Sequence, residues 1–290
     1  MALVQYSDSE SDSEQEAPPR KINKQSKSND DTGRKPASSL PPLPASFHDL
    51  YASSIRVSVR DDPSLHGGRK RAIPHVEGNW PTHIYLEWCP SKEELTILSG
   101  IITQAGNTLH GEQAKLNSFL YSDLGARLPL HISLSRPVVL RTEERQPFME
   151  AFEAALGSSD ISPFDVQVES LDWVSNFEKT RWFYVLRAKR PENDSLNRLL
   201  HISNRSLSLF GQPPLYEPVS NSSKLDGPQT ALVGDYTGCF HISIAWSLAE
   251  PLSEEKERMA SIDLGELSAL KIRFDCVKAK IGNNVSSIPL

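Results

Sequence analysis

The stretch HISLS, from His131 to Ser135, is repeated almost unchanged as HISIA, from His241 to Ala245. In a β-strand, residues two apart face the same side, so each histidine would share a face with the serine two positions later. The apolar residues between them would face a core. Two such strands supply an acid, a base and two neutral hydrogen-bond donors, the set needed to cleave a phosphodiester with a neighbouring 2′-hydroxyl.

A third His-x-Ser copy shows how weak one such tripeptide is as a signal. His201 and Ser203 lie within LNRLLHISNRSLSLF, whose pattern is helical. Residues two apart on a helix do not share a face, so we expect His201 to be a packed or surface histidine. The residues alone leave two interpretations of the other copies open: ordinary strand histidines with satisfied hydrogen bonds, or one shared site.

Composition limits the class of protein. The 290 residues are 38% hydrophobic and include 21 prolines, which indicates that part of the chain is not packed into a core. Cys89, Cys239 and Cys276 are widely spaced and form no CxxC pair, so we expect a reducing compartment and neither a disulfide framework nor a zinc knuckle. We find no apolar run of about 18 residues and no signal core, so we expect no membrane association and no secretion.

The formal net charge of −6 argues against a non-specific nucleic-acid coat. Any nucleic acid is expected to bind at a local site with few phosphate contacts. Residues 1–45 hold an acidic serine run, a lysine-bearing stretch and a proline cluster, and we expect a disordered tail that is either solubilising or partner-binding. Residues 46–290 are expected to form the folded domain. Its loop HGGRKR, residues 66–71, is either solvated surface or a phosphate contact.

Periodicity and turn residues predict an α/β or α+β sheet structure with helices outside it. We expect helices over residues 92–110 (after a capping box at Ser91 and Glu94), over 145–157 (capped by Thr142), over 194–210 and over 253–262. We expect strands over residues 83–88, 131–140, 164–174, 181–188, 240–246, 269–282 and 285–290. The Pro-, Gly- and Ser-rich segment 211–239 is expected to be a lid or locally disordered.

Several blocks of sequence resemble a known family. The segments HGGRKRAIPHVEGNWPTHIYLEW, NFEKTR, FHISIAW and KAKIGN are similar to the U6 small nuclear RNA 3′-phosphodiesterases, within the 2H phosphoesterase superfamily. The resemblance covers roughly residues 55–290. It implies an α+β, bilobal 2H fold with two pseudo-symmetric lobes, whose antiparallel sheets line a central cleft with helices outside.

The same resemblance implies metal-independent 3′-to-5′ exonuclease activity on RNA with a uridine-rich 3′ end, such as U6 small nuclear RNA. It implies a nuclear monomer with no cofactor and no metal. By position in the resemblance, His131 is the base that activates the 2′-hydroxyl and His241 is the acid. The sequence itself is symmetric on this point, so the reverse assignment stays open.

The catalytic set also includes the two motif serines, and four further residues are candidate substrate contacts. Ser133 and Ser243 are expected to donate hydrogen bonds to the non-bridging phosphate oxygens. Tyr236, in a glycine-bearing loop before the second motif, is either a platform for the terminal base or an ordinary loop tyrosine. Lys179 and Arg181 are candidate phosphate contacts. Ile132, between the first catalytic pair, is also counted among the substrate-binding residues.

Four alternatives can be weighed against the residues. A metal-dependent nuclease is poorly supported, because the eight histidines include no HExxH and no i,i+4 pair. A 2H enzyme with a small or tRNA-derived cyclic phosphate as substrate would keep the same residues. An RNA-binding module without catalysis would not need both histidines and both serines. Ser/His/Asp hydrolysis lacks the G-x-S-x-G elbow.

Overall fold

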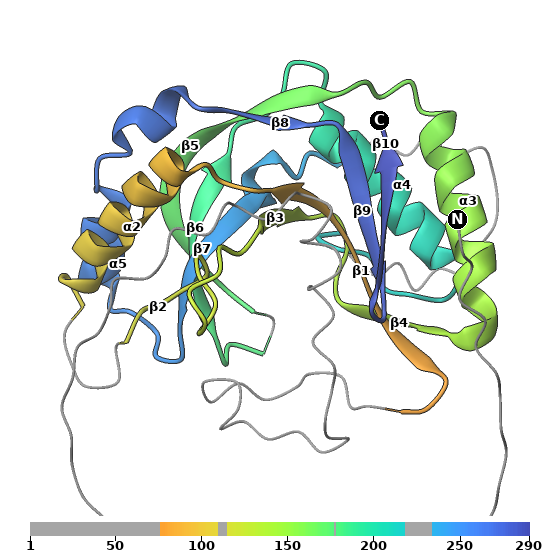
Figure 1. Ribbon diagram of the computed structural model, residues 1–290, viewed down its shortest axis with the longest axis horizontal. Helices are drawn as coiled ribbons and strands as arrows, with labels where there is room; N and C mark the ends of the chain where they lie inside the picture. Colours follow the sequence, from red (N-terminus) through yellow and green to blue (C-terminus); the bar gives the residue numbers. More distant parts are fainter. Residues whose placement is uncertain (1–75, 110–114, 177, 218–233) are drawn as a thin grey trace, which may run out of the picture. The chain divides into compact units, whose positions relative to one another are not determined.

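One antiparallel sheet, whose strands differ in length, dominates the computed structural model of the chain (Figure 1). The structure describes residues 76–109, 115–176, 178–217 and 234–290, so the expected tail, the HGGRKR loop and most of the segment 211–239 lie outside it. Within the described residues the strand order is β10-β9-β1-β3-β7-β6-β5-β8, with β4 paired to β1 and β2 paired to β7. The strands are β1 (Asn79–Trp88), β2 (Asn117–Ser118), β3 (Leu130–Ser133), β4 (Val138–Arg141), β5 (Phe164–Ser175), β6 (Trp182–Ala188), β7 (His241–Ser247), β8 (Lys271–Phe274), β9 (Cys276–Ile281) and β10 (Asn284–Pro289).

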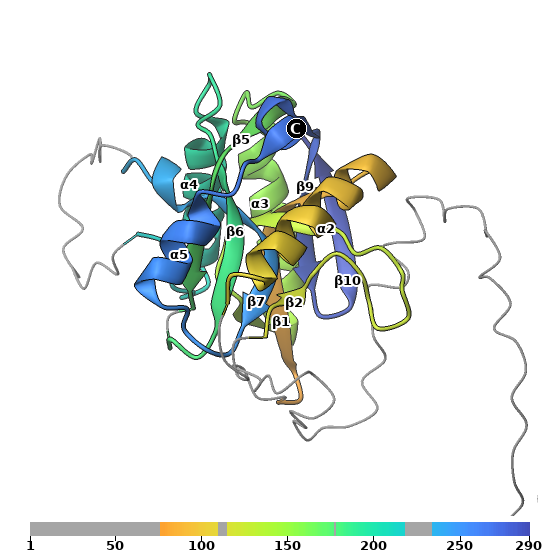
Figure 2. The ribbon, with the colours of Figure 1, turned by 90° about the vertical axis from the view of Figure 1, so that its left-hand side faces the viewer.

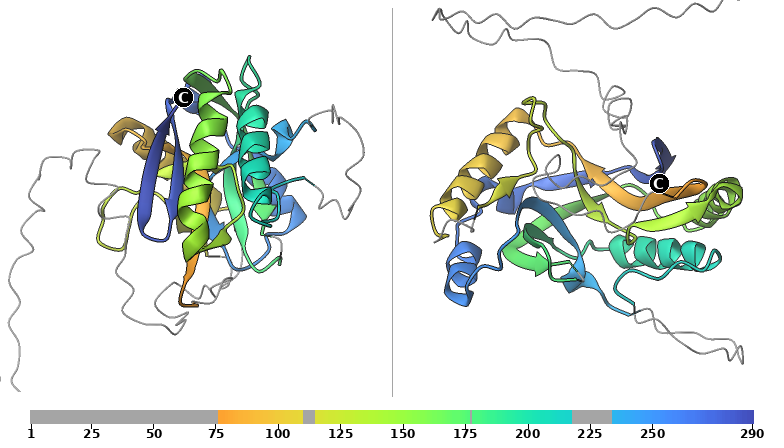
Figure 3. Two further views of the ribbon diagram at one scale, coloured as in Figure 1. Left: turned by 90° about the vertical axis from the view of Figure 1, so that its right-hand side faces the viewer. Right: turned by 90° about the horizontal axis from the view of Figure 1, so that it is seen from below.

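The helices gather in two pairs beside this sheet. They are α2 (Lys92–Gly106), α3 (Arg145–Gly157), α4 (Ser195–Ser208) and α5 (Ser253–Ala260). Figures 2 and 3 show α2 beside α5 at one end of the sheet and α3 beside α4 at the other. Each pair therefore joins one helix from the first half of the described chain to one from the second. The expected α+β class, with helices outside the sheet, is confirmed.

Alternation along β1 separates the two faces of the sheet. Ile84, Leu86 and Trp88 are buried, whereas His83, Tyr85 and the glutamate after Leu86 keep part of their surface exposed. The buried side belongs to the same hydrophobic cluster as the inner residues of the helices, so the helices cover this face. We call the opposite, polar side of the sheet the open face, and it carries His83 and Tyr85.

The two halves of the sheet meet between β3 and β7, where Ile132 pairs with Ile242 in antiparallel register. Both isoleucines are buried on the helix-covered face. The C-terminal hairpin crosses back to the first half, because β9 pairs with β1 and β10 pairs with β9. The two halves are therefore joined both by a central strand pair and by the C-terminal hairpin, which follows the second half in the chain but pairs with the first.

The predicted single strand over residues 131–140 is wrong, because β3 ends at Ser133 and β4 begins at Val138. Both strands pair with β1, at different parts of its length. Between them the hydroxyl of Ser135 accepts a 2.9 Å hydrogen bond from the backbone N–H of Ile84 and donates to the carbonyl of Arg136. A side chain thus replaces a ladder hydrogen bond of the backbone, which ends the strand.

Two other expectations need correction. The predicted strand over residues 269–282 is two strands: β8 pairs with β5, and β9 pairs with β1. Thr142 is no helix cap, because it lies in a 3-10 turn (Thr142–Glu144) before α3. Its hydroxyl instead accepts a hydrogen bond from the Trp80 indole (3.0 Å) and donates to the carbonyl of Gly78 (3.2 Å).

The remaining elements fall close to their predicted ranges. The capping box at Ser91 is confirmed: its hydroxyl accepts from the backbone N–H of Glu94, and the Glu94 carboxylate accepts from the backbone N–H of Ser91. The β5–β6 hairpin, the four helices among the described residues and the strand that starts at His241 are also confirmed.

Candidate active site

The two His-x-Ser motifs lie on neighbouring strands at the centre of the sheet. Because Ile132 pairs with Ile242 in antiparallel register, His131 lies across from Ser243, and Ser133 lies across from His241. Cross-strand partners share a face, so all four side chains project from the open face. Of the four, His131 is exposed and the other three are partly exposed. We call these four residues the His/Ser quartet.

This register gives the quartet a local two-fold arrangement about the isoleucine pair. Each imidazole lies beside the hydroxyl contributed by the other strand. A phosphate above the pair would therefore be flanked by one imidazole and one hydroxyl from each half of the sheet. Such a set can remove one proton, deliver another and donate two hydrogen bonds to the same phosphorus centre.

The surroundings of His131 favour its neutral form. Its ring lies 5.3 Å from the ring of His83 and 5.5 Å from that of Tyr85, edge-on in both cases. These two rings pack against His131, although the residue as a whole is exposed. Removal from water and the positive charge of His241 both lower the pKa of His131, to about 4. His131 is therefore ready to accept a proton at neutral pH.

His241 is held by its own backbone. Its Nδ1–H donates a 2.7 Å hydrogen bond to the carbonyl of Cys239, and Nε2 is left as the atom available for chemistry. Burial lowers the pKa of His241, while the Cys239 carbonyl acts in the opposite direction. The positive charge of Arg187 lowers the pKa and the negative charge of Asp172 raises it. The Cys239 carbonyl and the Asp172 carboxylate thus both favour the protonated form of His241.

Arg187 and Asp172 form a network next to His241. Arg187 lies across from His241 on β6 and donates to the Asp172 carboxylate at 2.9 and 2.6 Å. A third N–H of the same guanidinium donates to the carbonyl of Gly238 at 2.8 Å. The network ties the turn before His241 to strands β5 and β6, so it fixes the position of the backbone that holds the imidazole.

His83 is a site residue that the sequence analysis missed. Its Nε2 lies 3.1 Å from the hydroxyl oxygen of Ser133, and burial together with the charges of His131 and Lys280 lowers its pKa to about 3. His83 is therefore neutral at pH 7. An Nε2–H that donates to Ser133 would leave the serine proton free for a phosphate oxygen. Its alternation with the buried Ile84 and Leu86 marks the face, but the pairing of β1 with β3 is not readable from the sequence.

Tyr236 lies just before the 3-10 turn Thr237–Cys239, which leads into β7. Its backbone N–H donates to the side-chain carbonyl of Asn197 at 3.0 Å, and its ring folds over Gly234. A Cβ at Gly234 would lie 2.7 Å from the phenol oxygen, so this ring position requires glycine there. The ring is partly exposed. It lies on the chain segment that enters His241.

The other three residues predicted to contact substrate lie in different parts of the sheet and its turns. Ile132 is fully buried on the helix-covered face, so its side chain does not project from the open face, and its place among the substrate-binding residues stays a prediction that only its backbone could meet. Lys179 is exposed in the β5–β6 turn, with a positive φ of 51°. Arg181 directly precedes β6, with its guanidinium carbon 5.5 Å from the ring centroid of Trp246.

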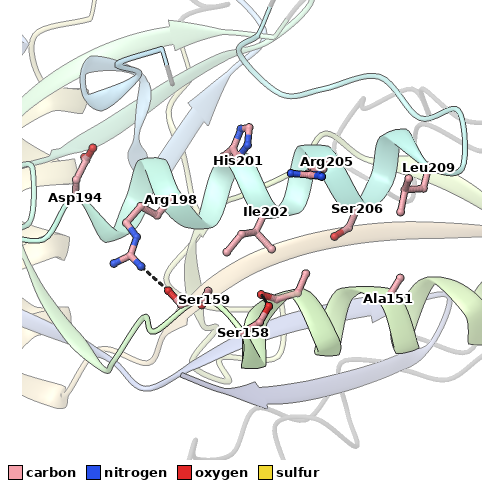
Figure 4. A pocket seen from close by; sticks show the side chains of 11 residues that line it. Ala151, Ser158, Ser159, Asp194, Arg198, His201, Ile202, Arg205, Ser206 and Leu209 are labelled. Carbon is pink, nitrogen blue, oxygen red and sulfur yellow. Dashed lines mark hydrogen bonds between the residues drawn. The ribbon is translucent and has the colours of Figure 1, made fainter. Parts of the chain in front are cut away.

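A groove of about 650 Å³ lies on the helical side of the molecule, between α3 and α4 (Figure 4). It is lined by His201, among others, and in it Arg198 donates to the carbonyl of Ser159. His201 and Ser203 are thus helical, as predicted, and lie outside the His/Ser quartet. Ser203 is buried and donates to the carbonyl of Leu199 at 2.8 Å.

In the part of the chain that the structure describes, no three His, Cys, Asp or Glu side chains form a group that could hold a metal ion. Within the same ranges, no helix is long and apolar enough to span a membrane.

The sheet and its two central His-x-Ser strands have the arrangement expected of a two-histidine (2H) phosphoesterase. Residues 41–289 match the HVSL family, described as an uncharacterised conserved protein. The chain is 34% identical to U6 snRNA phosphodiesterase 1 of Neurospora crassa, over 88% of this chain and 76% of that protein. It is 27% identical to U6 snRNA phosphodiesterase 1 of Homo sapiens, over 99% and 98% of the two chains. The chain belongs to the U6 snRNA phosphodiesterase 1 family.

A solved structure has the same fold. Usb1 of Kluyveromyces marxianus matches 73% of this chain and 98% of its own length, with a TM-score of 0.54 and 18% sequence identity. A second structure of that protein, with uridine monophosphate, matches with the same TM-score.

Proposed function

We propose that this protein is a metal-independent 3′-to-5′ RNA phosphodiesterase that trims the uridine-rich 3′ end of U6 small nuclear RNA, acting as a nuclear monomer. The observation that carries the proposal is the His/Ser quartet on one open face, with two imidazoles in different electrostatic surroundings. The substrate is taken from the names of the relatives, which are U6 snRNA phosphodiesterases.

The reaction uses the RNA's own nucleophile. Neutral His131 removes the proton of the 2′-hydroxyl on the penultimate ribose, and that oxygen attacks the adjacent phosphorus. As the new O2′–P bond forms, the bond from phosphorus to the 5′-oxygen of the terminal nucleotide breaks. His241 gives its Nε2 proton to the departing oxygen. The products are a terminal nucleoside and an RNA that ends in a 2′,3′-cyclic phosphate.

The assignment of base and acid follows the environments of the two rings. Burial lowers both pKa values, but a backbone carbonyl and a carboxylate act to raise only the pKa of His241. A positive charge on His241 also lowers the pKa of His131. The first proton that the pair takes up therefore goes to His241, which makes it the acid.

The serines act on the charge that builds on the phosphate. Ser133 and Ser243 donate to the non-bridging oxygens from opposite strands, and one donor of this kind is typically worth about 3 to 4 kcal/mol in the transition state. Tyr236 stacks on the terminal base from the side of His241. If the cyclic phosphate stays bound, the protonated His131 and neutral His241 are in the correct states to open it with water.

The experiment that tests this proposal is trimming of a 5′-labelled RNA with several terminal uridines, in excess EDTA. A matched RNA lacks only the 2′-hydroxyl of the penultimate ribose. We expect stepwise shortening of the first RNA and resistance of the second. His131→Ala and His241→Ala are expected to lose activity, whereas His201→Ala, the matched variant of the helical His-x-Ser copy, is expected to keep it.

The outcomes separate the alternatives. Shortening that requires a divalent metal would overturn the two-histidine mechanism. A small 2′,3′-cyclic nucleotide opened faster than the RNA is trimmed would favour a cyclic phosphodiesterase. Binding of the RNA without cleavage under either condition would favour a catalytically silent RNA-binding module.

A further inference from the structure

The open face carries a group of aromatic rings beyond the His/Ser quartet, which we call the aromatic platform: Phe119 and Phe183, with Trp246 and Arg181 beside them. The Phe119 and Phe183 rings lie nearly parallel, with centroids 6.3 Å apart and planes at 19°. The guanidinium of Arg181 lies over the same group, 5.5 Å from Trp246 and 6.0 Å from Phe183. Both phenylalanines keep part of their surface exposed. None of these rings has a role in the proposed reaction.

The register of the sheet places the platform directly after Ser243. Val185 lies across from Ser243 and Phe183 lies across from Trp246, with an irregularity of β7 between the two pairs. Phe183 is two residues from Val185 on β6, so both project from the open face. On the other side of β7, the backbone N–H of Phe119 donates to the carbonyl of Ile244 at 2.9 Å.

Tyr236 lies at the opposite end of the same strand, on the segment that leads into His241. Along the chain, the quartet residues of β7 are thus preceded by Tyr236, which lies before His241, and followed by the platform, which lies after Ser243. A dinucleotide has the matching layout, since its phosphate has one base on each side.

The assignment of His241 as the acid and His131 as the general base decides which nucleobase lies beside Tyr236 and which lies beside the platform. The leaving 5′-oxygen belongs to the terminal nucleotide and lies at His241, on the side of Tyr236. The attacking 2′-hydroxyl belongs to the penultimate nucleotide and lies at His131, which is across from Ser243 and therefore next to the platform.

We propose that Phe119 and Phe183 bind the base of the penultimate nucleotide, with Arg181 beside the RNA backbone that leads into it. This inference rests on the proposed function, because it uses the direction in which that reaction cleaves the chain. The ligand is any planar nucleobase, since every base has a stacking face. The platform positions the ribose that supplies the nucleophile. It selects for the presence of a base and not for its identity.

The test uses three 5′-labelled RNAs that end in uridines. One is complete, one has hydrogen in place of the penultimate base, and one has hydrogen in place of the terminal base. All three keep every 2′-hydroxyl. The wild type is compared with the double variant Phe119→Leu/Phe183→Leu, which keeps apolar volume but loses the rings. Phe210→Leu, a partly buried phenylalanine on the helical side that contacts Phe148, is the matched control.

We expect loss of the penultimate base to lower kcat/KM of the wild type roughly 5- to 150-fold, the range for one base stacked on an aromatic ring. The double variant should lose a similar factor on the complete RNA and nothing further when the penultimate base is absent. Loss of the terminal base should cost wild type and double variant the same factor. General misfolding would lower kcat/KM on all three RNAs by the same factor. The ratios of kcat/KM between the RNAs therefore report the platform alone.

The proposal would be overturned if removal of the penultimate base lowered kcat/KM by the same factor in the wild type and in the double variant. Coupling of the rings to the terminal base would overturn the assignment of positions. The same RNAs with 2′-deoxyribose at the penultimate position report binding without cleavage, through their Kd. If the wild type trims no RNA, the proposed function fails, and these Kd values still decide whether the rings hold a base.

Discussion

The roles of the two histidines can be tested by changing the leaving group of the RNA. A 5′-bridging sulfur in the scissile linkage leaves as a thiolate, the conjugate base of a thiol with a pKa of about 8.5, and so needs no acid. The normal 5′-oxygen leaves as an alkoxide and does need one. His241→Ala should therefore be slow on the oxygen-linked RNA and close to wild type on the sulfur-linked RNA. His131→Ala should be slow on both, because it lacks the base.

The size of the effect follows from the way His241 is held. Its Nδ1–H is bound to the Cys239 carbonyl at 2.7 Å, so the ring is fixed with Nε2 as its only acid, and burial makes that acid stronger by lowering its pKa. A positioned acid or base contributes about 10²- to 10⁴-fold. We expect a loss in this range for His241→Ala on the oxygen-linked RNA, and a loss of less than about tenfold on the sulfur-linked RNA.

The assay is single-turnover release of the terminal nucleoside, or its thiol, from matched RNAs. His201→Ala is the control for loss of a histidine outside the site. Rescue of His131→Ala by the sulfur linkage, with no rescue of His241→Ala, would reverse the assignment. Rescue of neither variant would show that acid catalysis is not what His241 contributes.

Three further outcomes are expected. Ser133→Ala should lower kcat about 10²- to 10³-fold in single-turnover assays, as for loss of one oxyanion donor, and an unchanged kcat would exclude this role. His83→Leu should lower kcat by less, and added to Ser133→Ala it should cost nothing more, because it acts through that hydroxyl; additive losses would contradict this. The kcat/KM profile should fall as pH rises through a pKa below 6.5, where His241 loses its proton. Asp172→Asn removes a charge that raises this pKa, so the falling limb should move to lower pH, and a shift to higher pH would disprove the assignment.

The sequence was sufficient for elements whose signals are local. The capping box at Ser91 and Glu94 depends on residues within one turn, and the alternation in the second motif strand depends on nearest neighbours. The end of β3 could not be predicted in this way, because it depends on a hydrogen bond between Ser135 and Ile84, which are far apart in the chain. Thr142 is polar and precedes a helix, but the Trp80 indole and Gly78 use its hydroxyl.

Which side chains surround the quartet likewise depended on strand pairing. The alternation in HISLS and HISIA gives the face that each motif shares, but not which strand lies beside it. His83 enters the site because β1 pairs with β3, and Phe183 lies near Ser243 because β6 pairs with β7. These strand pairs join residues more than 40 positions apart in the chain, and no local pattern encodes them.

The same motif can hold two roles because its two copies have different neighbours. Glu87 lies across from His131, and its carboxylate is 3.7 Å from the ammonium of Lys278, so its charge is shared with a cation. The residue across from His241 is Arg187, whose charge is in turn shared with Asp172. What remains different is the carbonyl of Cys239, which supports a proton on His241, and the crowding of His131 by the rings of β1. The two-fold arrangement of the strands supplies the paired groups, and in the proposed mechanism these unlike surroundings separate them into a base and an acid.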